Sequence, residues 1–244
     1  HIPLRRQRQM CIRDSTWDGK HELDASIMHG AQLNAGAVAG VTTVQSPIAL
    51  ARAVMEQSPH VMLASKGAEL FARELGVPEV SPAYFETERR KRALESYKAR
   101  KQAGVEPRVD YKFGTVGVVV LDSKGNLVAG TSTGGMTGKR WGRIGDAPVI
   151  GAGTYADNRS CAVSATGHGE YFIRHTVARD ICARMQFAGQ SLQEAAETVI
   201  TDELVAAGGD GGVVAVDASG EVSMVFNTPG MYRASVSGSG EKRI

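Results

Sequence analysis

The chain changes character at GTVGVVVLD, residues 114–122. Charged segments with helical periodicity lie upstream of this stretch, and glycine-punctuated apolar strands lie downstream. Successive side chains of a strand point to opposite faces, and apolar side chains occupy both faces of residues 116–121. We therefore expect a strand that is covered on both sides.

Thr115 opens this strand directly after a charged stretch with glycine and proline, which we expect to be an exposed linker. If a chain is cut before a threonine, that residue carries both a nucleophilic hydroxyl and an α-amine. An α-amine, with a pKa of about 8, can accept a proton at neutral pH. The bond between Gly114 and Thr115 is therefore a candidate cleavage site, and Thr115 is a candidate nucleophile.

The overall composition is that of an ordinary globular protein. The chain has 244 residues, of which 42% are hydrophobic and 22% are charged, and its formal net charge is +2. This length fits one compact domain, and this charge gives no electrostatic reason to expect nucleic acid as a partner. No apolar run approaches the roughly 20 residues that cross a bilayer, so we expect no membrane partner and a cytoplasmic location.

The three cysteines, Cys11, Cys161 and Cys182, form no CxxC pair. An odd number without such spacing predicts neither a disulfide framework nor a cysteine-based zinc site. The cysteines therefore favour a reducing compartment.

The sequence divides into three parts. Residues 1–15 have no helical or strand periodicity and contain QMCIRDS, which is similar to translated sequencing-adapter sequence, so we expect a non-native segment, a disordered basic arm being the alternative. Residues 16–114 alternate strands and helices and end in an expected linker from about 77 to 114. Residues 115–244 show strands, two helices (about 170–187 and 191–206) and strands again. This order suits two sheets packed face to face with helices outside.

Three familiar motifs fail on their context. Gly138-Lys139 lacks the earlier glycine and the following Ser/Thr of a phosphate-binding loop. Residues 151–156 match the loose GxGxxA pattern of dinucleotide sites, but Asp157-Asn158-Arg159 follows where a helix should begin. His168-Gly169-Glu170 matches the HxE of zinc deaminases, but no PCxxC follows it. We set all three aside.

Polar residues and glycines gather at the predicted strand ends downstream of Thr115. Taken singly, threonines in strands and glycines at turns have structural explanations. Thr166-Gly167, however, ends a strand just before a helix, where free backbone N–H groups can hold an oxyanion or a carboxylate. Arg143 and Asp146, in one loop, can bind a substrate carboxylate and its ammonium group. The combination points to a binding and catalytic site.

Three segments carry a resemblance to a known family: GTVGVVVLDSKGNLVAGTSTGGMTGKRWGRIGDAPVIGAGTYADN (114–158), SATGHGEYFIR (164–174) and NTPGMYRA (227–234). From about residue 18 onward, the chain resembles the plant-type L-asparaginases, also called isoaspartyl peptidases, of the N-terminal-nucleophile hydrolase superfamily. The resemblance implies an α+β fold, a four-layer αββα sandwich, that is activated by self-cleavage between Gly114 and Thr115.

The resemblance also implies catalytic roles. Thr115 would be the nucleophile and its freed α-amine the base, while Thr133 would orient the Thr115 hydroxyl. Thr166 and Gly167 would form the oxyanion hole. The reaction would pass through a β-aspartyl ester on Thr115 and would need no metal or other cofactor.

The implied substrates are β-aspartyl peptides and L-asparagine, that is, a dipeptide or a small molecule. The residues that would bind the aspartyl part are Arg143, Asp146, Gly167 and Gly169. The implied assembly is an αβ heterodimer cut from one precursor, which pairs into (αβ)2. Its parts would be a partial α-subunit at 16–114 and a β-subunit at 115–244.

Some family features do not appear in this sequence. Family members begin with a strand carrying His-Gly-Gly-Ala-Gly, followed by helices and a loop that binds a structural sodium ion, and we find none of these here. We therefore expect a sandwich without its N-terminal strand and helices, with an unpaired strand edge and exposed apolar surface. His168 occupies a position that varies in the family and is a candidate for tuning substrate preference.

Two alternatives stay open. One is a glycosylasparaginase, a superfamily relative that cleaves the amide joining N-glycans to asparagine, although the GMTGK loop at 135–139 favours the asparaginase side. The other is an unprocessed, inactive fragment.

Overall fold

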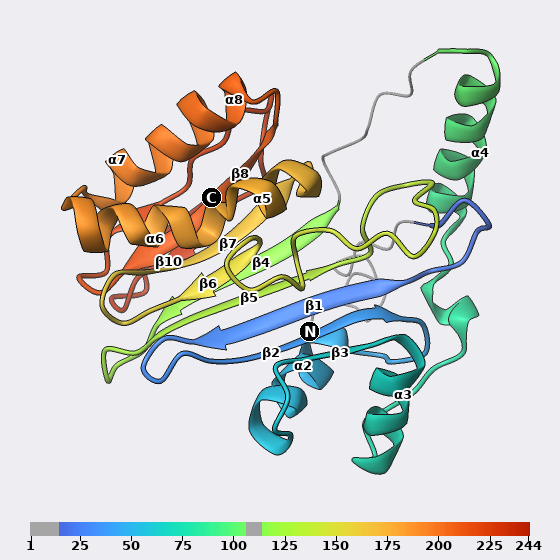
Figure 1. The fold of residues 1–244 in the computed structure, drawn as a ribbon, viewed down its shortest axis with the longest axis horizontal. Coiled ribbons are helices and arrows are strands. Elements are labelled where there is room, and N and C mark those ends of the chain that lie inside the picture. Colours follow the sequence, from blue (N-terminus) through green and yellow to red (C-terminus); the bar gives the residue numbers. More distant parts are fainter. Residues whose placement is uncertain (1–14, 106–113) are drawn as a thin grey trace.

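The computed structural model describes residues 15–105 and 114–244 and has two main sheets (Figure 1). The larger sheet has the strand order β3 (Met62–Ala64), β2 (Asn34–Val41), β1 (Leu23–His29), β5 (Leu127–Thr133), β4 (Thr115–Leu121). The smaller sheet has the order β6 (Thr154–Ala156), β7 (Cys161–Gly167), β8 (Gly211–Asp217), β9 (Val222–Ser223). A two-stranded ribbon consists of β10 (Ser235–Val236) and β11 (Lys242–Arg243). Neighbouring strands of both main sheets are antiparallel, except that β2 and β3 are parallel.

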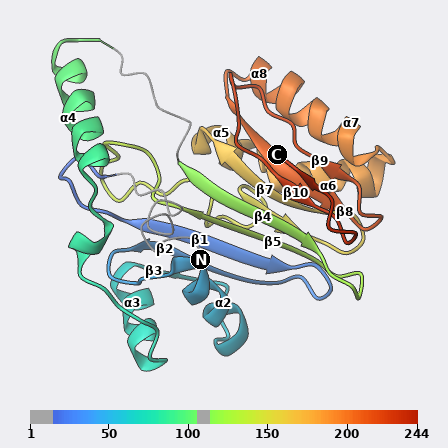
Figure 2. The ribbon, with the colours of Figure 1, turned by 180° about the vertical axis from the view of Figure 1, so that it is seen from behind.

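Helices lie on the outer side of each sheet (Figures 1 and 2). The larger sheet carries α2 (Pro47–Gln57) and α3 (Ser65–Glu74). The smaller sheet carries α5 (Gly169–His175), α6 (Val177–Ala188), α7 (Leu192–Glu197), the π-helical turn η3 (Thr198–Glu203) and α8 (Leu204–Ala206). The architecture is therefore mixed, with sheets and helices, as the order of elements predicts. None of the helices in the two described ranges is long and apolar enough to cross a bilayer.

The two sheets touch through small and hydroxyl-bearing side chains. Ser26 of β1 donates a hydrogen bond to Thr154 of β6 over 2.7 Å. Thr131 of β5 and Ser164 of β7 share another of 2.7 Å. Gly117 of β4 must be a glycine, because a Cβ there would lie 2.1 Å from Ser164 Oγ. These contacts place the inner faces of β4 and β5 directly against β7.

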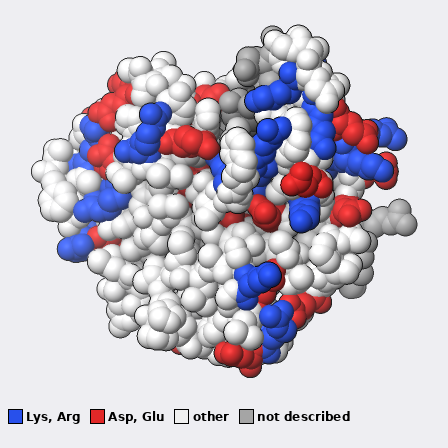
Figure 3. Space-filling view, turned by 45° about the vertical axis from the view of Figure 1, so that its right-hand side comes forward, with Lys and Arg blue, Asp and Glu red and all other residues white. Residues whose placement is uncertain are grey.

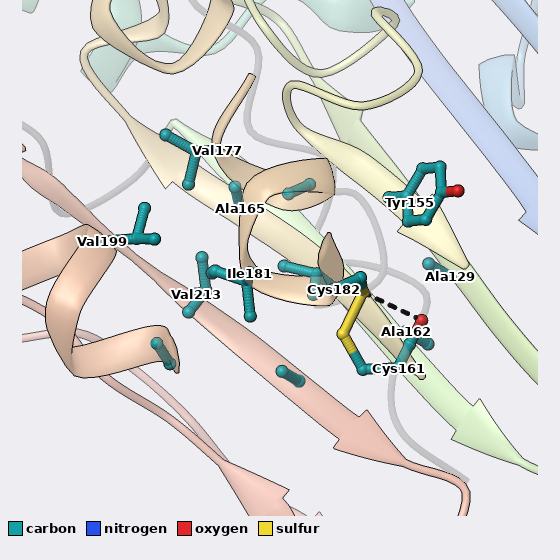
Figure 4. Packing of buried hydrophobic residues seen from close by; sticks show 14 of the residues in the cluster. Ala129, Tyr155, Cys161, Ala162, Ala165, Val177, Ile181, Cys182, Val199 and Val213 are labelled. Atoms are coloured by element: carbon teal, nitrogen blue, oxygen red, sulfur yellow. Dashed lines mark hydrogen bonds between the residues drawn. A yellow bond between two sulfur atoms is a disulfide. The ribbon is translucent and has the colours of Figure 1, made fainter. Parts of the chain in front are cut away.

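An apolar core packs on both sides of the smaller sheet, against its helices and against the larger sheet (Figure 4). Ile181, Val199 and Val213 belong to it. A second core, which includes Leu50 and Phe85, lies beneath α2. The first core therefore holds the smaller sheet from both sides, and the second holds the larger sheet from its outer side.

The larger core contains a disulfide between Cys161 and Cys182, which the cysteine pattern did not predict (Figure 4). Both residues are fully buried, and they join the start of β7 to α6. They lie 21 residues apart in the sequence and meet because α6 packs across β7. The odd cysteine count and the absence of a CxxC pair gave no sign of this single bond, and the argument for a reducing compartment loses its basis. Cys11 lies outside the described residues.

The strand β4 is not covered on both sides, so that prediction is also wrong. It is the edge strand of the larger sheet, and Val118 and Val120 on its outer face are 57% and 45% exposed. Its inner face packs against the larger core through Val119 and Leu121. Alternation of apolar residues identifies the two faces of a strand but does not show what covers each of them.

The charged connector contains a short 3-10 turn, η1 (Pro82–Phe85), and a regular helix, α4 (Glu88–Gln102). Thr87 caps α4 by accepting a hydrogen bond from the backbone N–H of Arg90. Basic and acidic side chains mix over the upper right of the molecule in Figure 3, where α4 lies. The connector is thus largely solvent-exposed, as predicted, and part of it is a regular helix. Residues 106–113 of the predicted linker (about 77–114) and residues 1–14 of the adapter-like segment (1–15) lie outside the described residues.

Candidate active site

Thr115 is the first residue of β4 and lies opposite Thr133, the last residue of β5. The Thr115 hydroxyl donates a hydrogen bond to Thr133 Oγ1 over 3.3 Å. The Thr133 hydroxyl in turn donates to the carbonyl oxygen of Gly114. The backbone N–H of Gly135 donates to Thr133 Oγ1 over 3.0 Å. The peptide bond before Thr115 therefore belongs to one compact hydrogen-bonded group.

This group can prepare the peptide bond of Gly114 for nucleophilic attack. A hydroxyl offers one donor and two acceptor positions, and Thr133 uses all three here. Its donated hydrogen polarises the Gly114 carbonyl, and the Thr115 hydroxyl lies beside it. In the uncut chain the nitrogen of Thr115 is an amide, so it could act as a base only in a chain cut before Thr115.

The loop between β5 and β6 carries Arg143 and Asp146. Arg143 forms a bidentate ion pair with Glu170 of α5, with Nε and Nη2 each 2.8 Å from a carboxylate oxygen. This hydrogen bonding lowers the pKa of Glu170. His168 Nε2 lies 3.4 Å from the same carboxylate, so Glu170 is shared by two basic side chains.

Asp146 is buried with an unused hydrogen-bonding position. It is 7% exposed, and its Oδ2 has no hydrogen-bond partner among the residues that the structure describes. Burial raises its pKa to about 7. A buried carboxylate oxygen without a donor is costly, and the ammonium group of a ligand would supply the donor.

Gly167 and Gly169 lie where no other side chain fits. At Gly169 a Cβ would lie 2.9 Å from both Arg143 Nη2 and Asp146 Oδ1. At Gly167, where φ is +156°, a Cβ would lie 2.4 Å from the carbonyl oxygen of Asp210. The backbone after Thr166 therefore lies directly against the loop of Arg143 and Asp146.

These groups lie at the same end of the two sheets. Figures 1 and 2 both place the start of β4 beside the junction of β7 and α5. Asp24 of β1 links the groups, because it pairs with Thr133 in the sheet and interacts electrostatically with Arg143 and Asp146. The structure thus gathers the predicted site residues at one end, although their roles stay predictions. They are Gly114, Thr115, Thr133, Arg143, Asp146, Thr166, Gly167 and Gly169.

Three charged residues of this region were missing from the predicted site: Asp24, Lys139 and Glu170. Lys139 and Glu170 drew attention only as parts of longer motifs, and neither received a role of its own. Asp24 gave a clearer signal, because it is a carboxylate in the apolar strand LDASIM, and such a residue needs a buried partner. The sequence does not say which partner.

Across residues 15–105 and 114–244, no group of three or more His, Cys, Asp or Glu side chains could hold a metal ion. That no cofactor takes part in the reaction stays a prediction.

Three features lie at one end of two facing sheets: a threonine hydroxyl beside a polarised carbonyl, a guanidinium and a buried carboxylate. Together they define the class of the protein as a hydrolase. Comparison with known families gives the same class, since the family described as asparaginase matches residues 14–244. The chain belongs to this asparaginase family.

The relatives bear similar names. The isoaspartyl peptidase of Escherichia coli K12 is 52% identical over 226 residues, which cover 90% of this chain and 70% of that protein. A putative isoaspartyl peptidase/L-asparaginase of Dictyostelium discoideum is 45% identical over 251 residues, covering 89% of this chain and 72% of that protein. The probable isoaspartyl peptidase/L-asparaginase 2 of Arabidopsis thaliana is 44% identical over 241 residues, covering 89% and 73%.

Proposed function

We propose that the chain is the precursor of an amidohydrolase that acts on β-aspartyl peptides and L-asparagine. The names of its relatives support this substrate class. The observation that carries the mechanism is the contact of the Thr133 hydroxyl with the Gly114 carbonyl, next to the Thr115 hydroxyl.

In the proposed activation, Thr115 Oγ1 attacks the carbonyl carbon of Gly114. The bond from this carbon to the Thr115 nitrogen breaks, and the hydroxyl proton ends on that nitrogen, which leaves an ester between Gly114 and Thr115. Water then hydrolyses the ester to a Gly114 carboxylate and a free Thr115 hydroxyl. The products are residues 1–114 and residues 115–244, and Thr115 now carries a basic α-amine.

In the proposed reaction, this α-amine takes the proton of the Thr115 hydroxyl while Oγ1 attacks the side-chain carbonyl carbon of the aspartyl group. Thr166 and Gly167 supply the donors that stabilise the oxyanion. The bond to the leaving nitrogen breaks, the proton passes to that nitrogen, and ammonia or a peptide amine departs. Water hydrolyses the β-aspartyl ester, which releases aspartate and restores Thr115.

Arg143 and Asp146 hold the substrate in this scheme. Glu170 uses the Nε and Nη2 edge of Arg143, and the Nη1 side can receive the α-carboxylate. The α-ammonium group binds the carboxylate of Asp146, whose Oδ1 lies beside Gly169. Such a bond pairs the charge of a buried carboxylate and stabilises its ionised form.

The proposal includes a four-layer αββα sandwich and an αβ heterodimer that pairs into (αβ)2. Helices on the outer side of each of two facing sheets support the sandwich (Figure 1). The division at Gly114 would leave β1, β2 and β3 in the first product and the remaining sheet strands in the second.

Intact mass spectrometry and three substrates test this function. We expect a split between Gly114 and Thr115, and hydrolysis of β-Asp-Leu and L-asparagine. A preference for glycosyl-asparagine would instead make the chain a glycosylasparaginase. A full-length protein that stays uncut and inactive would contradict the proposal and favour the inert fragment.

A further inference from the structure

A buried ion pair lies beside Thr133 and has no part in the mechanism above. The side chain of Lys139 is 1% exposed and that of Asp24 is fully buried. Lys139 Nζ lies 3.9 Å from Asp24 Oδ2 and 3.6 Å from Glu22 Oε2. It also donates to the backbone carbonyl of Glu22 over 3.0 Å. Burying a lysine costs several kcal/mol, so its presence here calls for a role.

Asp24 has one structural task, which does not need its charge. Its Oδ1 accepts a hydrogen bond of 2.8 Å from the N–H of Gly40, near the bulge in the pairing of β1 with β2. An asparagine oxygen could accept the same bond. Its Oδ2 has no hydrogen-bond partner in the described part of the chain and faces Lys139. The charge of Asp24 is therefore available to hold the lysine.

Lys139 packs beneath the turn that follows Thr133. At Gly135, where φ is +82°, a Cβ would lie 3.1 Å from Lys139 Cδ and 3.2 Å from its Nζ. The lysine thus supports the residue whose N–H donates to Thr133 Oγ1. The same Thr133 hydroxyl contacts the carbonyl of Gly114, so one chain of contacts runs from the lysine through Gly135 and Thr133 to that carbonyl.

The pairing of the strands brings the ion pair close to the proposed cleavage site. Asp24 pairs with Thr133, and Thr133 pairs with Thr115, so the three residues form one row across β1, β5 and β4. Only one residue separates Asp24 from Thr115 along this row. A shift in the position of the ion pair would therefore reach the bond between Gly114 and Thr115 through a single intervening residue, Thr133.

Anchoring of the loop does not by itself explain the buried lysine. The backbone of this loop is already tied down, because Gly138 N–H donates to the Ser15 carbonyl over 2.7 Å and Trp17 N–H donates to the Lys139 carbonyl over 2.9 Å. Neither bond uses the lysine side chain.

We propose that Lys139 and Asp24 are positioning residues for self-cleavage: the lysine, held by Asp24, places Gly135 and thereby the Thr133 hydroxyl against the Gly114 carbonyl. This inference rests on the proposed function and adds to it two residues that do not touch the reacting atoms.

The test follows cleavage of the full-length protein over time by intact mass spectrometry during cell-free synthesis. Lys139→Met keeps the apolar stem but removes the charge, and we expect it to slow cleavage at least about tenfold. Asp24→Asn keeps the bond to Gly40 and should slow cleavage less. The double variant Lys139→Met/Asp24→Asn should cleave faster than Lys139→Met alone, because the single variant leaves the buried carboxylate of Asp24 unpaired. Lys124→Met, in the turn after β4, is the matched control and should cleave as the wild type does.

The Michaelis constant separates positioning from general damage. Once matured, Lys139→Met should hydrolyse β-Asp-Leu with a KM within about twofold of wild type, because Arg143 and Asp146 are intact. A KM raised as strongly as cleavage is slowed would show that Lys139 merely stabilises the loop, and would overturn the inference.

If Lys139→Met fails to fold, Asp24→Asn decides: a wild-type cleavage rate in that variant overturns the inference. A wild-type chain that never cleaves would overturn the proposed function first, whereas normal cleavage in both variants overturns only the role of the pair.

Discussion

The two strands that carry the proposed chemistry lie in opposite surroundings. β7, which ends at Thr166 and Gly167, lies between β6 and β8, and its residues 161–165 are all buried. β4, which begins at Thr115, is an edge strand with an exposed outer face. A strand that only presents backbone donors benefits from rigid surroundings, because its N–H groups must stay in place. A strand that must release the segment before it needs space and water, and an edge provides both.

The largest effect on cleavage and activity should come from a substitution in the edge strand β4. Thr115→Ala removes the hydroxyl that both cleavage and hydrolysis require, so the chain should stay uncut and lose activity by about 10⁴-fold or more. Intact mass and β-Asp-Leu hydrolysis measure the two effects. Thr228→Ala, in a loop near the C-terminus, is the control. A Thr115→Ala chain that is still cut after Gly114 would show that another group performs the attack.

A substitution of Arg143 should weaken substrate binding and leave cleavage of the chain intact. Arg143→Ala should lower kcat/KM by about 100-fold, because a substrate carboxylate loses its charged partner. Cleavage should continue, since the groups that contact Gly114 are Thr133 and Thr115. Arg52→Ala, an exposed arginine on α2, is the control. Loss of cleavage in Arg143→Ala would mean that the two regions do not act separately.

Asp146 should make substrate binding depend on pH. Its pKa of about 7 means that the anion that binds the ammonium group is progressively lost in acid. The KM for β-Asp-Leu should therefore rise about tenfold for each pH unit below 7. In Asp146→Asn, KM should be higher and no longer depend on pH in this range. An unchanged pH profile in that variant would assign the effect to another group.

The same residue should make the free protein less stable at high pH. Its folded pKa lies above the ordinary value of 3.8, so the folded chain binds the proton more tightly than the unfolded chain does. The stability from this proton is fully present below the unfolded pKa and is lost as the pH rises through about 7. Asp146→Asn should thus raise the free energy of unfolding at pH 8, by at most about 4 kcal/mol, and change it little at pH 4. Urea denaturation without substrate measures this, and equal effects at both pH values would contradict it.

The smallest effect tests the contrast in burial. Val163→Ala, at a fully buried position of β7, should lower the free energy of unfolding by about 2 kcal/mol, from lost apolar burial and a cavity. Val118→Ala, at an exposed position of β4, should lower it by less than about 0.5 kcal/mol. Urea denaturation compares them. Equal losses would show that the outer face of β4 is covered in solution.

Local patterns predicted the elements well where neighbours in sequence decide the structure. Ser191 followed three residues later by Glu194 predicts a capping box, and both of its hydrogen bonds are present at the start of α7. The turn residues 123–126 (SKGN) likewise predict a hairpin, and β4 and β5 form it. The helix expected at about 170–187 is instead two helices, which meet at Thr176, where φ is +47°. No glycine or proline marks that break, so the sequence pattern could not show it.

Features that depend on packing between distant segments could not be predicted. The disulfide and the exposed face of β4 follow from how α6 and the sheets pack, and the ion pair of Arg143 with Glu170 spans 27 residues. The candidate site was found in two stages for the same reason. Polar residues at strand ends indicated a site, but individual roles for Thr133 or Gly169 came only from resemblance to a family.

The order of strands in the larger sheet also has a consequence for timing. β1 precedes Gly114 in the chain, β5 follows it, and six residue pairs join them, from Asp24 with Thr133 to His29 with Val128. After a cut at Gly114, these backbone bonds would hold two separate polypeptides together. A chain cut before β1 and β5 had met would leave two pieces that must find each other by diffusion, whereas a chain cut afterwards never separates. The lysine that supports Thr133 contacts Asp24 of β1. The groups around the Gly114–Thr115 bond would therefore be in place only after β1 and β5 have paired. Cleavage would then occur only in chains that have folded.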